Sequence, residues 1–148
     1  MTETTTEPLT EAEVDEFVRD WYRQLDVHAP IEEVIPYLAD DGLEFTIPEG
    51  TRRSHAEMRD QLNAWYTTFF DEVHTMKELD ITPRGDQADV KLVVNWKARI
   101  WNPPEAESKF LHFDAYQTWV VRRGASGKPE ILSYVVGNLE AQPDSSPL

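Results

Sequence analysis

Hydrophobic and polar positions alternate with a period of two along residues 86–101, which predicts a β-strand with one buried and one solvated face. One side carries Val90, Leu92, Val94, Trp96 and Ala98, and the other carries Lys91, Asn95, Lys97 and Arg99 together with Val93. A typical strand has about 5–6 residues, and a much longer strand in a small domain usually curls. We therefore predict a curved sheet whose concave side forms a pocket.

Helical patterns come before this strand. A first helix begins at the capping box of Thr10 and Glu13, a short second helix begins near Pro30, and Pro36 interrupts it. A third helix begins at Ser54 and runs to about residue 70. The apolar stripe of the first helix is Val14, Phe17, Val18, Trp21 and Leu25, and that of the third is Met58, Leu62, Trp65, Tyr66 and Phe69.

Strand patterns dominate the rest of the chain. A short strand over 43–47 lies between the second and third helices, and long strands over 72–82, 108–123 and 129–140 accompany the one described above. In the 72–82 strand, His74 and Met76 fall on the face opposite to Leu79 and Ile81. A β-bulge between residues 75 and 78 would bring all four side chains to one face, so we predict a bulge there.

This order of elements predicts an α+β domain. Three N-terminal helices pack in the concave face of a strongly curved, mainly antiparallel sheet. With 148 residues we expect one domain over residues 9–140, and the polar segments 1–8 and 141–148 have the composition of disorder.

Composition narrows the classes of function. The chain has no cysteine, which excludes disulfides and thiolate metal sites, and its net charge of −14 disfavours binding to nucleic acid or anionic membranes. No segment has the pattern of a signal peptide or a membrane span, so we expect a cytoplasmic protein. No metal-ligand spacing or phosphate-binding loop is visible, and we expect no cofactor.

The whole pattern resembles the nuclear transport factor 2-like superfamily, the cone fold of ketosteroid isomerases, SnoaL-like cyclases and scytalone dehydratase. The likeness rests on Trp21-Tyr22 in the first helix, the run LADDGLEFTIPEG over 38–50, Ser54-His55, and the last hairpin from Tyr116 to Tyr134. It covers about residues 9–140. The resemblance implies a deep, mostly apolar pocket inside the cone and a homodimer formed through the sheet.

The resemblance to ketosteroid isomerases also implies positions for a tyrosine, an aspartate base and a second aspartate. Trp21 lies at the tyrosine position with Tyr22 beside it, Ile47 lies at the position of the base, and Gln117 lies near the second aspartate. Ile47 cannot abstract a proton and Gln117 cannot act as an acid. These residues argue against the isomerase mechanism.

Dehydratase-like members of the superfamily use histidine and aspartate within the cone, and the candidates here are His74 and Asp114, with His112 beside Asp114. As a general base, His74 needs a carboxylate or carbonyl that fixes its tautomer. No such partner is visible in the sequence, which favours a half-buried histidine bonded to backbone. We expect His28 and His55, at helix boundaries, to cap helices or to be exposed.

Large aromatic side chains either fill the cone or line a pocket for a small apolar or aromatic molecule. The candidate ligand-binding residues are Trp21, Tyr22, Ile47, Trp65, Phe69, Trp96, Gln117 and Trp119, with His74 as the candidate catalytic residue. Three functions stay open: a small-molecule-binding protein, an acid–base enzyme that uses His74, and a non-catalytic dimeric module whose tryptophans close the cone. A pocket of about 300 Å³ or more would exclude the third, and a carboxylate beside His74 would favour the second.

Overall fold

The computed structural model describes residues 7–147, and the expected disorder of residues 1–8 falls mostly outside that range. Its helices are α1 (Glu11–Asp26), α2 (Ile31–Val34), the 3₁₀ turn η1 (Ile35–Tyr37) and α3 (His55–Thr68). Both N-caps of the predicted capping boxes form, because the side chains of Thr10 and Ser54 accept hydrogen bonds from the backbone N–H three residues later. The reciprocal bond from the glutamate does not form, since Glu13 accepts from Arg123 and Glu57 from the N–H of Arg53. No helix in residues 7–147 is long and apolar enough to cross a membrane.

The strands form one six-stranded sheet. They are β1 (Glu44–Ile47), β2 (Gly50–Arg52), β3 (Phe69–Arg84), β4 (Gln87–Ile100), β5 (Lys109–Arg123) and β6 (Pro129–Ala141). The order across the sheet is β2-β1-β6-β5-β4-β3, and only the β1–β6 pair is parallel. The α+β class, the helices first and the mainly antiparallel sheet are as the sequence predicts.

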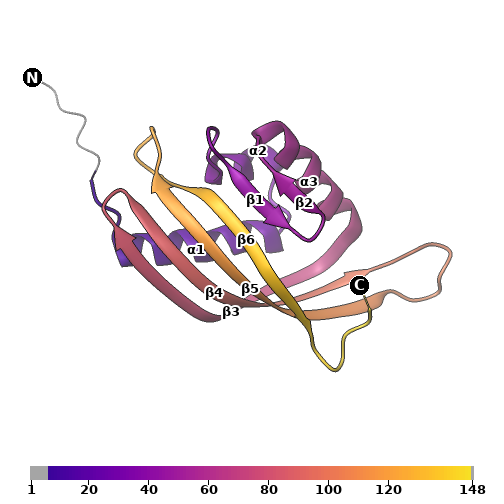
Figure 1. Ribbon diagram of the computed structural model, residues 1–148. Coiled ribbons are helices and arrows are strands. Elements are labelled where there is room, and N and C mark those ends of the chain that lie inside the picture. The colour runs from indigo at the N-terminus through magenta and orange to yellow at the C-terminus, as the bar shows by residue number, and fades with distance from the viewer. Residues whose placement is uncertain (1–6, 148) are drawn as a thin grey trace, which may run out of the picture.

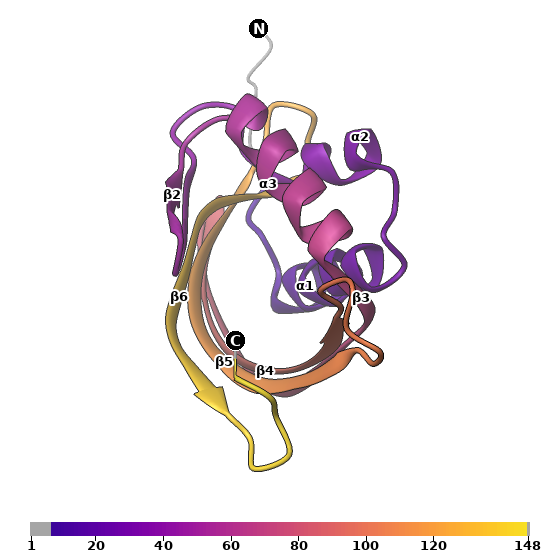
Figure 2. The ribbon, with the colours of Figure 1, turned by 90° about the vertical axis from the view of Figure 1, so that its right-hand side faces the viewer.

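The sheet curves strongly, and the helices lie over its concave side (Figure 1). Figure 2 looks into the open end, where β6, β5, β4 and β3 form an arc that α1 and α3 close. A continuous core fills the other end, between α1 and the sheet, and includes Trp21, Phe45, Leu92, Trp119 and Ile131. The fold is therefore a cone with one packed end and one open end.

The predicted faces of β4 are confirmed. Val90, Leu92 and Val94 are buried and Lys91 and Lys97 are exposed. Two side chains differ from expectation. Trp96 is only partly buried because it lies beside a cavity, and Arg99 is half-buried, where it donates to Ser108 and packs over Phe110.

Strand β3 contains the predicted bulge, since its pairing with β4 shifts between Met76 and Glu78. Met76, Leu79 and Ile81 accordingly all pack against the same core. A second, unpredicted shift lies between Phe70 and Val73, where Asp71 has a positive φ of 52°. Bulges bend a strand and increase its twist, so both contribute to the curvature of the sheet.

The C-terminal segment returns along β5 after β6 ends. The backbone N–H of Gln142 donates to the carbonyl of His112, and that of Ser146 donates to the carbonyl of Phe110. Asp144 pairs with the ring of His112 at 2.6 Å. These contacts place residues 142–146 beside β5, and the disorder that polar composition predicts for 141–148 stays a prediction.

We predict that Leu92→Ala lowers the free energy of unfolding by about 2–5 kcal/mol, because it leaves a cavity in the packed end of the cone. Lys91→Ala, the adjacent position on the exposed face of the same strand, should change it by less than about 0.5 kcal/mol. Urea denaturation measures both. Equal losses for the two variants would mean that the faces of β4 are assigned wrongly.

Candidate functional site

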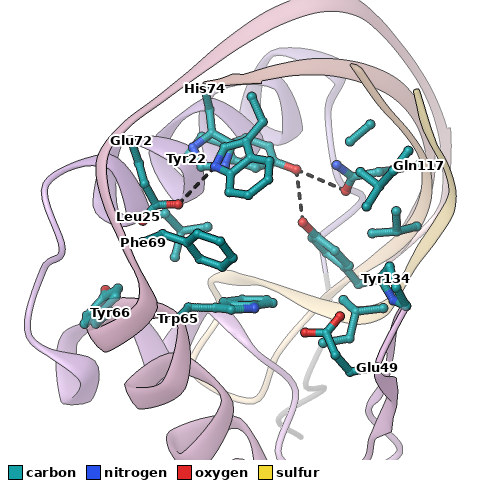
Figure 3. Close-up of a pocket in the computed structure, with 16 residues that line it drawn as sticks. Tyr22, Leu25, Glu49, Trp65, Tyr66, Phe69, Glu72, His74, Gln117 and Tyr134 are labelled. Atoms are coloured by element: carbon teal, nitrogen blue, oxygen red, sulfur yellow. Dashed lines mark hydrogen bonds between the residues drawn. The ribbon is translucent and has the colours of Figure 1, made fainter. Parts of the chain in front are cut away.

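The open end of the cone contains a pocket of about 360 Å³ (Figure 3). Its apolar and aromatic wall comprises Leu25, Ile47, Pro48, Trp65, Phe69, Trp96, Ala115, Val136 and Leu139, and its polar members are Tyr22, Glu49, Tyr66, Glu72, His74, Gln117 and Tyr134. These residues come from α1, α3, five strands and the β1–β2 turn. Pockets for small molecules are typically built this way, apolar with a few directed polar groups.

The structure brings most of the sequence-predicted site residues together. The pocket lining includes Tyr22, Ile47, Trp65, Phe69, His74, Trp96 and Gln117. The prediction that Trp21 and Trp119 also line this cavity is wrong, because both indoles are buried in the packed end of the cone. Trp21 and Trp119 do point toward the interior of the cone. They lie toward its packed end, where side chains fill the interior.

His74 has a carboxylate partner, Asp26, the last residue of α1. The ring Nδ1 lies 2.5 Å from Oδ1 of Asp26, and the backbone N–H of His74 donates to both carboxylate oxygens at 3.1 and 3.2 Å. A hydrogen must lie between two acceptors this close, so the neutral ring carries its proton on Nδ1 and its lone pair on Nε2. The ring also packs 4.7 Å from the ring of Tyr22, so its orientation is fixed from two sides.

Sequence reasoning missed Asp26 and considered Asp114 instead. Asp114 lies on the outer face of the sheet, where Lys77 and Asn95 donate to its two oxygens at 2.7 and 2.9 Å. Burial alone would raise its pKa, but these hydrogen bonds and the charge of Lys77 hold the pKa of Asp114 below its ordinary value. It is an outer structural ion pair and does not reach the pocket.

One signal for Asp26 was present in the sequence. Asp26 follows Tyr22 by four residues, so both lie on the same face of α1. A carboxylate in the last turn of a helix is also unfavourable for the helix dipole. A residue that is locally unfavourable in this way is usually stabilised by a contact elsewhere in the fold. For Asp26 that contact is with the backbone and ring of His74.

A hydrogen-bonded network occupies the wall between α1 and β5. Oε1 of Gln117 accepts from the Tyr22 hydroxyl at 3.0 Å and from the Trp119 indole N–H at 2.9 Å, and the hydroxyls of Tyr22 and Tyr134 lie 3.2 Å apart. Because Tyr22 gives its proton to Gln117, Tyr134 donates to Tyr22. Figure 3 shows the hydrogen bonds among Tyr22, Gln117 and Tyr134 along one side of the pocket.

Within residues 7–147, this network leaves the two N–H donors of the Gln117 side-chain amide without a partner. Gln117 is 6% exposed and lines the pocket, yet its Nε2 group has no hydrogen-bond partner in the part of the chain that the structure describes. Burial raises the pKa of Tyr22 well above its ordinary value and that of Tyr134 to about 12, so neither is a base at neutral pH. The wall therefore offers N–H groups to an acceptor on a ligand.

A second histidine–carboxylate pair lies near the pocket entrance. Glu72 accepts from the Trp96 indole N–H at 3.1 Å and lies 2.5 Å from Nε2 of His28. His28 thus does not cap a helix, whereas His55 bonds to the carbonyl of Leu38 at the start of α3. Within residues 7–147, no three His, Asp or Glu side chains converge as metal ligands would.

No family model and no curated protein matches this chain significantly. Solved structures do resemble it. A hexachlorocyclohexane dehydrochlorinase has a TM-score of 0.73 and 14% identity, covering 93% of this chain and 91% of that one. A putative scytalone dehydratase from Novosphingobium aromaticivorans has a TM-score of 0.70 and 17% identity over 93% of this chain and 88% of its own.

A nuclear transport factor 2-like superfamily protein from Salmonella enterica has a TM-score of 0.71 and 13% identity, covering 91% of this chain and 92% of its own. Such low identities establish architecture and say nothing about activity. Together with the helix order, the curved sheet and the open end described above, these comparisons show that the chain has the nuclear transport factor 2-like cone fold.

Proposed function

We propose that the protein is an acid–base enzyme that binds a small apolar or aromatic molecule in the cone and removes a proton from it with His74. The observation that carries this proposal is the contact of 2.5 Å between Nδ1 of His74 and Asp26. In the neutral imidazole this contact fixes the proton on Nδ1 and the lone pair on Nε2, and the ring lines a mostly apolar pocket. A general base needs this combination of reach, correct tautomer and access.

Proton transfer assigns a role to each partner. Nε2 of His74 takes a proton from a carbon of the ligand, and the C–H electron pair stays on that carbon. Asp26 stabilises the imidazolium that forms, as a carboxylate does when it is bonded to Nδ1–H of a catalytic histidine. The free Nε2 group of Gln117 donates to an oxygen on which the released electron density gathers.

The size of the pocket supports a ligand over a cone filled by its own side chains. A volume of about 360 Å³ lies within the roughly 300–1,000 Å³ of small-molecule sites. This argues against the non-catalytic module among the three functions considered. A pure binding protein would have no need of a histidine held in one tautomer, which is why we favour catalysis.

Elimination is the reaction class that we propose. Two of the structural neighbours are called a dehydrochlorinase and a putative dehydratase, names that denote loss of hydrogen chloride and of water. In such a step His74 removes the proton from carbon, the electron pair forms a double bond, and the group on the neighbouring carbon leaves with its bonding pair. The dyad of Asp26 and His74 suits the first part of this step.

We predict that the enzyme accelerates deuterium exchange at the acidic carbon of 2-tetralone, an aromatic ketone that fits a pocket of this size. NMR in D₂O measures the rate. His74→Gln should reduce exchange to the buffer rate, and Asp26→Asn should slow it by about a hundredfold or more, because an asparagine amide favours the wrong histidine tautomer.

The control for this experiment is His55→Gln, which changes a histidine bonded to backbone outside the pocket. Binding of 2-tetralone is followed separately by the shift in melting temperature. Binding without any exchange would contradict the catalytic role and leave a binding protein. Exchange that survives in His74→Gln would assign the base to another residue.

We predict a double effect of substitutions at Gln117. Gln117→Leu should lower the free energy of unfolding by about 1–3 kcal/mol, because the hydroxyl of Tyr22 and the indole of Trp119 lose their buried acceptor. Gln117→Glu keeps that acceptor but replaces the free N–H donors. It should lose affinity for 2-tetralone, by calorimetry, and its melting temperature shows whether it is folded. A Gln117→Leu protein that is both fully stable and fully able to bind would disprove this account of Gln117.

A homodimer formed through the outer face of the sheet stays a prediction, as does a cytoplasmic location. Tyr116 is a large hydrophobic residue exposed on that face, at 39%. We expect a dimeric mass by light scattering at micromolar concentration, and Tyr116→Arg should shift it to a monomer. Val27→Arg, at an exposed valine away from the sheet, is the control. A monomeric wild-type mass would contradict the dimer.

A further inference from the structure

Glu72 is a nearly buried carboxylate in an aromatic wall. Its side chain is 8% exposed and belongs to the pocket lining. The N–H groups of Trp96 and His28 are its partners, and no lysine or arginine pairs with it in residues 7–147. A carboxylate taken out of water without a permanently charged partner is costly. The carboxylate of Glu72 therefore needs a compensating interaction that explains its place in the pocket.

The backbone is specially arranged to hold this carboxylate in place. The two non-glycine residues with positive φ in the described chain are His28, at 49°, and Asp71, at 52°. Asp71 lies in the bulge that precedes Glu72, and bulges of this kind re-aim a side chain. One partner of the contact, His28, and the residue before the other, Asp71, thus have uncommon backbone conformations, which concentrate at functional sites.

Aromatic rings lie beside both members of the pair. Tyr66 stacks on the ring of His28 with centroids 4.3 Å apart, and Phe69 meets Trp96 edge to face at 5.0 Å. Burial, followed by the charge of Glu72, raises the pKa of Tyr66 to about 12. Aromatic faces beside a carboxylate provide two attractions for a cation, one from the ring quadrupole and one from the charge.

The free positions on Glu72 fit only a donor. Its two oxygens together have about four acceptor sites, and the N–H groups of Trp96 and His28 occupy two of them. The remaining sites on Glu72 are hydrogen-bond acceptors on a carboxylate. They repel the carboxylates and phosphates of a ligand. The net charge of −14 of the whole chain acts in the same direction, since it attracts cations and repels anions.

We propose that Glu72 pairs with a protonated amine on the ligand. This inference rests on the proposed function, because it needs the pocket to bind a small molecule. The proposed pairing gives the ligand two polar ends, each next to different residues of the pocket. An oxygen acceptor lies toward Gln117 and His74, and an ammonium lies toward Glu72 beside Phe69 and Trp96, with an apolar body between the two ends.

Matched probes test this directly. We would measure dissociation constants of 2-naphthylmethylamine and 2-naphthylmethanol by calorimetry at about pH 8, where a primary amine is protonated. The two compounds differ only in the terminal group. We expect the amine to bind about tenfold more tightly than the alcohol, because the ammonium adds an ion pair with Glu72 and cation–π contacts that an uncharged hydroxyl cannot make.

Glu72→Gln keeps an acceptor for one N–H donor and removes the charge. It should reduce the preference for the amine to less than about twofold while leaving affinity for the alcohol unchanged. Glu16→Gln, the same change at an exposed glutamate of α1 outside the pocket, should keep the preference. The melting temperature of each variant shows that it is folded.

The outcomes separate this inference from the proposed function. Equal binding of amine and alcohol to the wild type would make the pair of Glu72 and His28 a closed structural contact and overturn the inference, while the pocket stands. A preference that survives in Glu72→Gln would also overturn it. If neither compound binds, both the inference and the proposed aromatic ligand fail.

Discussion

The carboxylate of Asp26 joins the end of α1 to the edge strand β3, and the arrangement of the open end of the cone depends on this contact. An edge strand has unpaired N–H groups, and Asp26 satisfies that of His74 with both oxygens. The same carboxylate receives the ring Nδ1–H. One side chain therefore fixes the position of the helix, closes part of the sheet edge and selects the tautomer of the candidate base.

Curvature of the sheet divides the interior into two regions with different chemistry. Toward one end, Trp21, Phe45 and Trp119 pack into a core without space for a ligand. Toward the other end the sheet diverges from the helices, and polar groups appear among the aromatic ones. The two bulges of β3 serve this division. The one at Met76 keeps the core side chains on the inner face, and the one before Val73 turns Glu72 into the pocket.

Local patterns predicted most of the architecture, because alternation and capping are properties of neighbouring residues. The faces of β4, the helix N-caps and the bulge near Met76 all follow from spacing along the chain. The position of a side chain along the axis of the cone does not follow from this spacing. Periodicity says that Trp119 points inward but not whether it meets core or cavity, and this is why Trp119 was misplaced.

Contacts between distant segments were the other limit of the sequence. Asp26 and His74 are 48 positions apart, and nothing local connects them, so the histidine appeared to lack a carboxylate. Glu72 was overlooked for a related reason, since an unrecognised bulge with a positive φ at Asp71 sets its direction. Both residues break a local rule, Asp26 at a helix C-terminus and Glu72 as a carboxylate in an aromatic wall. Such conflicts are where function is expected.

The central claim is that Asp26 holds His74 with the proton on Nδ1 and the lone pair on Nε2, open to the pocket. A long-range ¹H–¹⁵N correlation spectrum of the histidine rings tests it most directly, with the His74 signals assigned by their loss in His74→Gln. The account predicts that above neutral pH His74 is a single Nδ1–H tautomer with an unprotonated Nε2. A His74 ring that carries its proton on Nε2, or that exchanges between the two tautomers, would contradict it.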